Sequence, residues 1–185
     1  MFGTELSTEL KNLKIAHCNQ DSARCLFDVM KDSINDKEKT NFDRAVAFYI
    51  VNKCSFSGLT ESSSFSAQAS DSNFSMRGIE KLPEYQEIIS NWHINGYSYE
   101  HLLEYNPHDG LFMYLDPPYD IKDNLYGKKG AMHKSFDHDK FAEDCDQHNH
   151  IKMLISYNSD QLVKDRFKNW NAGEFDLTYT MRSVG

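Results

Sequence analysis

The residues best suited to chemistry form a tetrapeptide, Asp116-Pro117-Pro118-Tyr119, directly after a short apolar run at residues 110–115. Such a run is typical of a buried strand in a parallel sheet, and ligands bind beyond the carboxyl ends of these strands. There the Asp116 carboxylate and the Pro117 carbonyl could each accept a hydrogen bond from an aromatic amino group, which would free the nitrogen lone pair. Tyr119 offers a flat ring for stacking on a base. The tetrapeptide therefore predicts a site that activates the amino group of a heterocycle.

The alternative for this tetrapeptide is a plain strand terminator, because two prolines end a ladder and fix the turn that follows. An Asp-Pro-Pro-aromatic sequence is rare by chance, and its placement after an apolar strand makes coincidence rarer. We therefore favour the chemical interpretation.

The elements that must position this site change character along the chain. Residues 21–33, 42–53 and 82–92 have apolar side chains at helical spacing, and the Ser-rich residues 55–75 are expected to form a loop anchored by Phe56, Phe65 and Phe74. Further along, strands are expected at residues 110–115, 151–156 and 175–181, alternating with helices at residues 136–148, capped by Asp137, and 160–170. The pattern predicts a helical part, residues 1–92, followed by an α/β part, residues 93–185.

Composition limits the class of protein. The chain has 185 residues, of which 39% are hydrophobic and 13% aromatic, as expected for one folded domain or one domain with a small lobe. It has no apolar run long enough for a membrane span and no signal peptide, so we expect a cytoplasmic protein. Its formal charge of -8 disfavours nucleic acid as a partner. Basic residues nevertheless cluster locally, at Lys122, Lys128, Lys129 and Lys134, and at Lys164, Arg166 and Lys168.

Cysteines and histidines suggest neither a disulfide nor a metal site. Four cysteines lie scattered without a paired framework, so we expect reduced thiols. Cys145, His148 and His150 have a spacing that fits no common zinc pattern, and a solvated helix end is expected there instead.

The chain resembles the DNA adenine-N6 methyltransferases of the Dam-like branch, and most closely the versions carried by T4-like cyanophages. The resemblance rests on residues 45–66, the Asp-Pro-Pro-Tyr motif, the loop at residues 119–130, the segment at residues 153–162 and the tail at residues 175–185. It implies a Rossmann-like methyltransferase sheet with a helical target-recognition lobe inserted before the motif. It also implies S-adenosylmethionine as methyl donor and an adenine flipped out of double-stranded DNA as acceptor. In phage-encoded members the location would be the host cytoplasm.

The resemblance also assigns roles to single residues. Asp116, Pro117, Pro118 and Tyr119 would form the catalytic motif. Within it, Asp116 and Pro117 would polarise the amine, and Tyr119 would stack on the adenine. Members of the family often carry Gly-Asp-Phe at the cofactor adenine, where this chain has Tyr97-Ser98-Tyr99, and Asp116 would also face the cofactor. From their positions in the chain, the expected DNA contacts are Ser57, Lys128, Lys129, Asn158 and Arg182. The alternatives are an exposed charged loop for Lys128 and Lys129, a turn cap for Asn158 and a surface role for Arg182.

One part of the family pattern is not found in this chain. Members begin with a Pro-Gly-Gly-Lys type segment, a glycine-rich loop after the first strand and an acidic residue for the ribose hydroxyls. The nine glycines of this chain include no Gly-Gly and no Gly-x-Gly. A loop of that kind lets backbone approach a cofactor closely, so the sequence predicts a member without its N-terminal cofactor segment that binds S-adenosylmethionine weakly or not at all.

Three hypotheses follow. The leading one is a site-specific DNA adenine-N6 methyltransferase. A second is a non-catalytic DNA-binding remnant, and a third is an amino-methyltransferase that acts on RNA or protein. The sequence defines neither the DNA target nor the oligomeric state.

Overall fold

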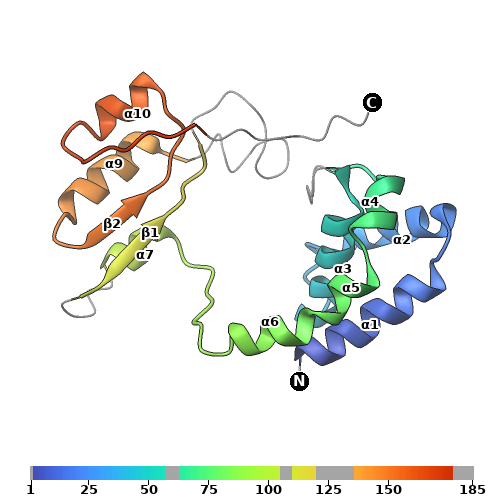
Figure 1. Ribbon diagram of the computed structural model, residues 1–185. Helices are drawn as coiled ribbons and strands as arrows, with labels where there is room; N and C mark the ends of the chain where they lie inside the picture. Colours follow the sequence, from blue (N-terminus) through green and yellow to red (C-terminus); the bar gives the residue numbers. More distant parts are fainter. Residues whose placement is uncertain (1, 57–62, 105–109, 120–135, 177–185) are drawn as a thin grey trace. The chain divides into compact units, whose positions relative to one another are not determined.

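A computed structural model describes residues 2–56, 63–104, 110–119 and 136–176 of the chain (Figure 1). These residues form two compact units, Met1–Asn95 and Gly96–Gly185. The first unit is built from helices: α1 (Phe2–Ala16), α2 (Gln20–Ser33), α3 (Asn41–Cys54), α4 (Ala67–Ser72), α5 (Met76–Glu80) and α6 (Leu82–Ile88). The second unit mixes helices and strands: α7 (Tyr99–Glu104), β1 (Phe112–Leu115), α9 (His138–Gln147), β2 (Lys152–Ile155) and α10 (Gln161–Arg166).

Capping and amphipathic spacing explain the helices of the first unit. The Asn19 side chain accepts a hydrogen bond from the Ser22 N–H at 2.9 Å and starts α2. Thr40 and Asp43 form a reciprocal capping box that starts α3. Helices α1, α2 and α3 contribute most of one continuous core. Its buried members are Leu10, Leu26, Phe27, Ile34, Val46, Ala47, Ile50, Val51, Cys54, Phe74 and Ile79.

The Ser-rich segment is more ordered than the sequence predicts. Ser55 and Phe65 form an antiparallel bridge, and α4 follows at once, with the Ser66 hydroxyl capping its first turn. The expected anchoring is confirmed for two of the three rings. Phe74 is 2% exposed, and Phe65 packs against the core with its ring centroid 5.7 Å from that of Phe27. The expected anchoring is wrong for Phe56, whose side chain is 65% exposed.

Other boundaries also differ from the sequence predictions. The helix expected over residues 82–92 ends at Ile88, because Ser90 and Trp92 continue in single turns rather than in a helical ladder. Helix α1 was not anticipated, because its weak amphipathic pattern is interrupted by polar residues. Of the strand expected at residues 175–181, the structure describes only Phe175 and Asp176, and neither is in a strand.

A parallel ladder organises the second unit. Strands β1 and β2 pair in parallel with Leu115 opposite Ile155, and α9 lies between them in the chain. Parallel neighbours need such a crossover connection. Asp137 caps α9 by accepting a hydrogen bond from the Lys140 N–H at 2.9 Å, as predicted. Phe141 and Cys145 of α9 pack against Leu115 and form the core of this unit.

The prediction that both strands are buried holds for one face only. Met113, Met153 and Ile155 pack toward the core, whereas Tyr114 and Leu154 are 59% and 56% exposed. The reason is that α9 covers one face, and the described residues of this unit place no helix over the other. Strand alternation then turns every second side chain outward.

The packing of Phe74 leads to a first prediction. Phe74→Ala should lower the free energy of unfolding by about 3–5 kcal/mol, because it leaves a cavity in a closed core. Urea unfolding followed by circular dichroism measures this. Phe56→Ala is the matched control, and its exposed ring predicts a change within about 0.5 kcal/mol. Equal losses in the two variants would contradict this account of the Ser-rich segment.

Candidate active site

The candidate site begins where the two paired strands end. Leu115 and Ile155 are partners in the ladder, and the Ser156 N–H donates to the Leu115 carbonyl at 3.0 Å, which extends the pairing by one residue. Asp116 and Ser156 therefore lie side by side at one edge of the sheet. The Asp116 side chain is exposed, so its carboxylate is accessible to a substrate. Pro117, the next residue, is buried in the unit.

Two hydroxyl groups form a directed chain that ends on Asp116. The Ser156 Oγ donates to Asp116 Oδ1 at 2.5 Å, and the Tyr114 hydroxyl donates to Ser156 Oγ at 3.0 Å. A serine hydroxyl has a single proton and can accept while it donates. One carboxylate oxygen of the motif is thus fixed by the second strand.

An aromatic cluster lies beside the motif. The rings of Tyr119 and Tyr157 are near parallel, with centroids 6.4 Å apart and an interplanar angle of 26°. Tyr157 also contacts Phe141 and Phe167, and its hydroxyl shares a hydrogen bond with His138 Nδ1. Tyr119, half buried, is therefore at the outer end of a row of rings that continues into the core.

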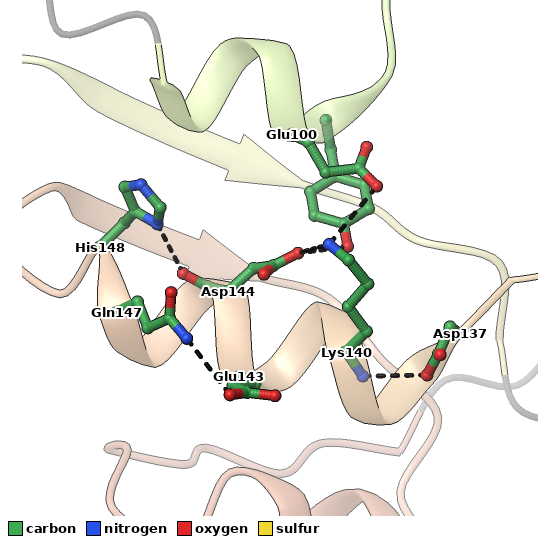
Figure 2. Close-up of polar contacts among 8 residues, drawn as sticks. Glu100, Asp137, Lys140, Glu143, Asp144, Gln147 and His148 are labelled. Carbon is green, nitrogen blue, oxygen red and sulfur yellow. Dashed lines mark hydrogen bonds and ion pairs between the residues drawn. The ribbon is translucent and has the colours of Figure 1, made fainter.

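A polar network joins α7 to α9 (Figure 2). The Tyr99 hydroxyl donates to Asp144 Oδ2 at 2.8 Å, and Lys140 forms ion pairs with Asp144 and, at 3.7 Å, with Glu100. Burial, together with the hydrogen bond to Asp144, raises the pKa of Tyr99. Burial alone would raise the pKa of Asp144, but the bonds from Lys140 and Tyr99 lower it. The network therefore holds α7 against α9, at the end of the unit that contains Tyr97, Ser98 and Tyr99, the residues expected at the cofactor.

Those three residues differ in their surroundings. Tyr97 is 67% exposed and its ring lies against His101, while Ser98 is exposed and bonds to Glu100. Tyr99 instead packs against Phe136 and Phe141. The role of all three at a cofactor stays a prediction.

Of the residues expected to contact DNA, the structure describes only Asn158. Asn158 follows β2 and its Nδ2 donates to Asp160 Oδ2 at 2.6 Å, beside the cap of α10. Its contact with DNA stays a prediction. Ser57, Lys128, Lys129 and Arg182 lie outside the described residues.

Several residues of the site were missed by the sequence analysis: Tyr114, His138, Ser156 and Tyr157. A usable signal existed for two of them. Ser156 and Tyr157 follow the second apolar strand directly, as Asp116 follows the first, and parallel strands bring such positions together. His138 and Tyr114 have no comparable signal, because their places depend on side-chain packing.

A hollow between α9 and α10 is a poor candidate for a nucleic-acid site. It is lined by the carboxylates of Asp139, Glu143, Asp146 and Asp165, and Arg166 is paired with Asp139 at 2.6 Å. Four carboxylates against two cations, Arg166 and Lys168, disfavour phosphate at this surface. Cys145, expected at a solvated helix end, is instead buried in the core, and burial raises the pKa of its thiol to about 12. No group of three metal-ligating side chains occurs among the described residues.

Comparison with protein families gives the site its context. The family model for D12 class N6 adenine-specific DNA methyltransferases matches residues 5–181. The chain belongs to this family. The chemistry of the D12 class is methylation of adenine in DNA, and the mixed helix and strand content with a small parallel sheet agrees with a methyltransferase fold. No curated protein matches the chain. None of the described helices is long and apolar enough to cross a membrane.

The cofactor of such enzymes does not fit the residues that the structure describes. Strand β1 is followed by Asp-Pro-Pro-Tyr and strand β2 by Ser-Tyr-Asn, so neither described strand leads into a glycine-rich turn. Tyr99, expected at the cofactor adenine, has its hydroxyl bonded to Asp144. Neither described strand of this D12 class member therefore offers the glycine-rich turn expected at the cofactor.

The raised pKa of Tyr99 predicts a loss of stability at alkaline pH. The folded state retains the phenol proton more tightly than the unfolded chain, whose tyrosine pKa is about 10. The stabilisation is therefore fully present below that pH and is lost as the pH rises above it. Urea unfolding of the parent and of Tyr99→Phe at pH 8, 9, 10 and 10.5 should give a difference in free energy that is constant at first and shrinks above about pH 10. A constant difference over the whole range would contradict the assignment.

Proposed function

We propose that this D12 class member is a site-specific DNA adenine-N6 methyltransferase, of the phage type, in which Asp116 and Pro117 activate the amine of an adenine flipped out of double-stranded DNA. The observation that carries the proposal is the exposed Asp116 carboxylate at the carboxyl end of a parallel ladder. A hydroxyl from the neighbouring strand holds one of its oxygens, and the rings of Tyr119 and Tyr157 lie beside it.

The proposed chemistry follows from the acceptors at this edge. The lone pair of an exocyclic adenine amine is delocalised into the ring, which makes the nitrogen a weak nucleophile. The Asp116 carboxylate and the Pro117 carbonyl would accept one hydrogen bond each from the two N–H groups and favour a pyramidal nitrogen. Proline suits its position because it has no N–H that would compete for the substrate. Tyr119 would cover one face of the base, as an enzyme that acts on a flipped base requires.

The methyl donor, the roles of the two parts of the chain and the DNA contacts complete the proposal. S-adenosylmethionine as methyl donor rests on the family alone. We assign target recognition to residues 1–92 and the catalytic part to residues 93–185. Contacts with DNA are assigned to Ser57, Lys128, Lys129, Asn158 and Arg182. The family name favours DNA over RNA or protein as the substrate.

A second candidate function is a DNA-binding remnant that holds an adenine without methylating it. It is favoured by the observation that neither described strand leads into a glycine-rich turn. The two functions share the adenine site and differ in methyl transfer.

Transfer of labelled methyl groups from S-adenosylmethionine to DNA separates these functions. In a version of the chain that carries the family's glycine-rich cofactor segment, Asp116→Ala should abolish incorporation and leave DNA binding largely intact, because the carboxylate acts on the reacting amine rather than on phosphate. Asp176→Ala, which removes an exposed carboxylate elsewhere in the unit, should match the parent. Incorporation that survives Asp116→Ala would remove the catalytic assignment. DNA binding without incorporation by the parent would establish the remnant.

Tyr119 provides a prediction about the base. In the version that carries the family's cofactor segment, Tyr119→Phe and Tyr119→Trp should keep substantial activity, because stacking needs the ring and not the hydroxyl. Tyr119→Ala should lose about 1–3 kcal/mol of stacking, which is roughly ten- to a hundred-fold in activity. The fluorescence of 2-aminopurine at the target position reports flipping directly. If Tyr119→Ala and Tyr119→Phe agree in rate and fluorescence, Tyr119 is a packing residue.

A further inference from the structure

The Asp116 side chain is exposed, so its own packing does not select one orientation. An exposed aspartate rotates among staggered states, and a rotating carboxylate presents its acceptor to a substrate amine only part of the time. Something else must orient this side chain if it is to act on an amine held in one place.

The second strand provides that orientation. Ser156 follows the last paired residue of β2, and its backbone is held by the 3.0 Å hydrogen bond to the Leu115 carbonyl. The backbone of Ser156 is therefore fixed relative to that of Asp116, and its Oγ donates to Oδ1 at 2.5 Å. A donor anchored in the ladder selects one orientation of the carboxylate.

Tyr114 determines the direction of that hydroxyl. It lies two residues before Asp116, on the same face of β1, and its hydroxyl donates to Ser156 Oγ at 3.0 Å. With Oγ accepting from Tyr114, the serine proton points to Asp116. Oδ1 accepts this hydrogen bond, and Oδ2 is the oxygen that we assign to the substrate amine.

We propose that Ser156, supported by Tyr114, is the positioning residue of the adenine-activating carboxylate. The proposal rests on the proposed function for its catalytic consequence, but the orientation of Asp116 is measurable without any reaction. Neither residue touches the substrate amine, and both act through Asp116.

The first test is independent of activity. The three-bond Hα–Hβ couplings of Asp116, measured by NMR on the whole chain, should differ from rotationally averaged values in the parent and in Ser156→Thr, which keeps the hydroxyl. They should become averaged in Ser156→Ala. Ser159→Ala is the matched control, because this neighbouring exposed serine bonds to Glu174 instead, and it should leave the Asp116 couplings unchanged. Couplings that are the same in the parent and in Ser156→Ala, whether fixed or averaged, would overturn the proposal.

The second test uses methyl transfer. Ser156→Ala should lower kcat about 10- to 100-fold, as expected for a misplaced catalytic group, with KM for DNA changed less than about twofold. Ser156→Thr should restore most of the rate, and Tyr114→Phe should cost only about 2- to 10-fold, the value of one neutral hydrogen bond. An unchanged kcat in Ser156→Ala would overturn the positioning role. If activity is independent of Asp116 itself, the proposed function fails, and the couplings alone then decide whether Ser156 orients the carboxylate.

Discussion

The parallel pairing of β1 with β2 is the constraint on which the rest of the site depends. Because Leu115 is opposite Ile155, the next residue of each strand emerges at the same edge, and Asp116 meets Ser156. A shift of one residue in this register would turn Ser156 to the other face and remove the donor from the carboxylate. The pairing itself depends on α9, whose Phe141 and Cys145 fill the space under Leu115. The chemistry at the surface is thus fixed by packing a few residues away.

The same helix connects the sheet edge at Asp116 to the polar network at α7. Phe141 contacts both Tyr99 and Tyr157, so one buried ring lies between the Tyr99–Asp144 hydrogen bond and the aromatic row that ends at Tyr119. Charged groups complete this arrangement at the surface, where Lys140 pairs with both Asp144 and Glu100. Exposed pairs of this kind contribute little stability by themselves. The contact between α7 and α9 rests instead on Tyr99, which packs against Phe141 and donates to Asp144.

The sequence was informative where one local rule decides the outcome. The Asp137 cap, the apolar spacing of α3 and the strand before Asp116 follow from such rules, and these elements lie close to their predicted places. Sequence patterns failed where contacts distant in the chain decide. Phe56 and Phe74 look equivalent in the sequence, but only Phe74 reaches the core between α3 and α1. The role of Ser156 was not predicted, because it depends on a hydrogen bond to Asp116, which lies 40 residues earlier in the chain. Membership of the D12 class agrees with the resemblance that the Asp-Pro-Pro-Tyr motif and its surroundings suggested.

The central claim is that the edge formed by Asp116, Ser156 and Tyr119 receives an adenine through its amino group. NMR titration with a short single-stranded oligonucleotide tests it directly, because an unpaired adenine needs neither a target sequence nor flipping. The account predicts shifts of the backbone signals of Asp116, Tyr119 and Tyr157, and it predicts that these shifts weaken when each adenine is replaced by purine, which lacks the amine. Shifts that are equal for adenine and purine, or that avoid these residues, would contradict it.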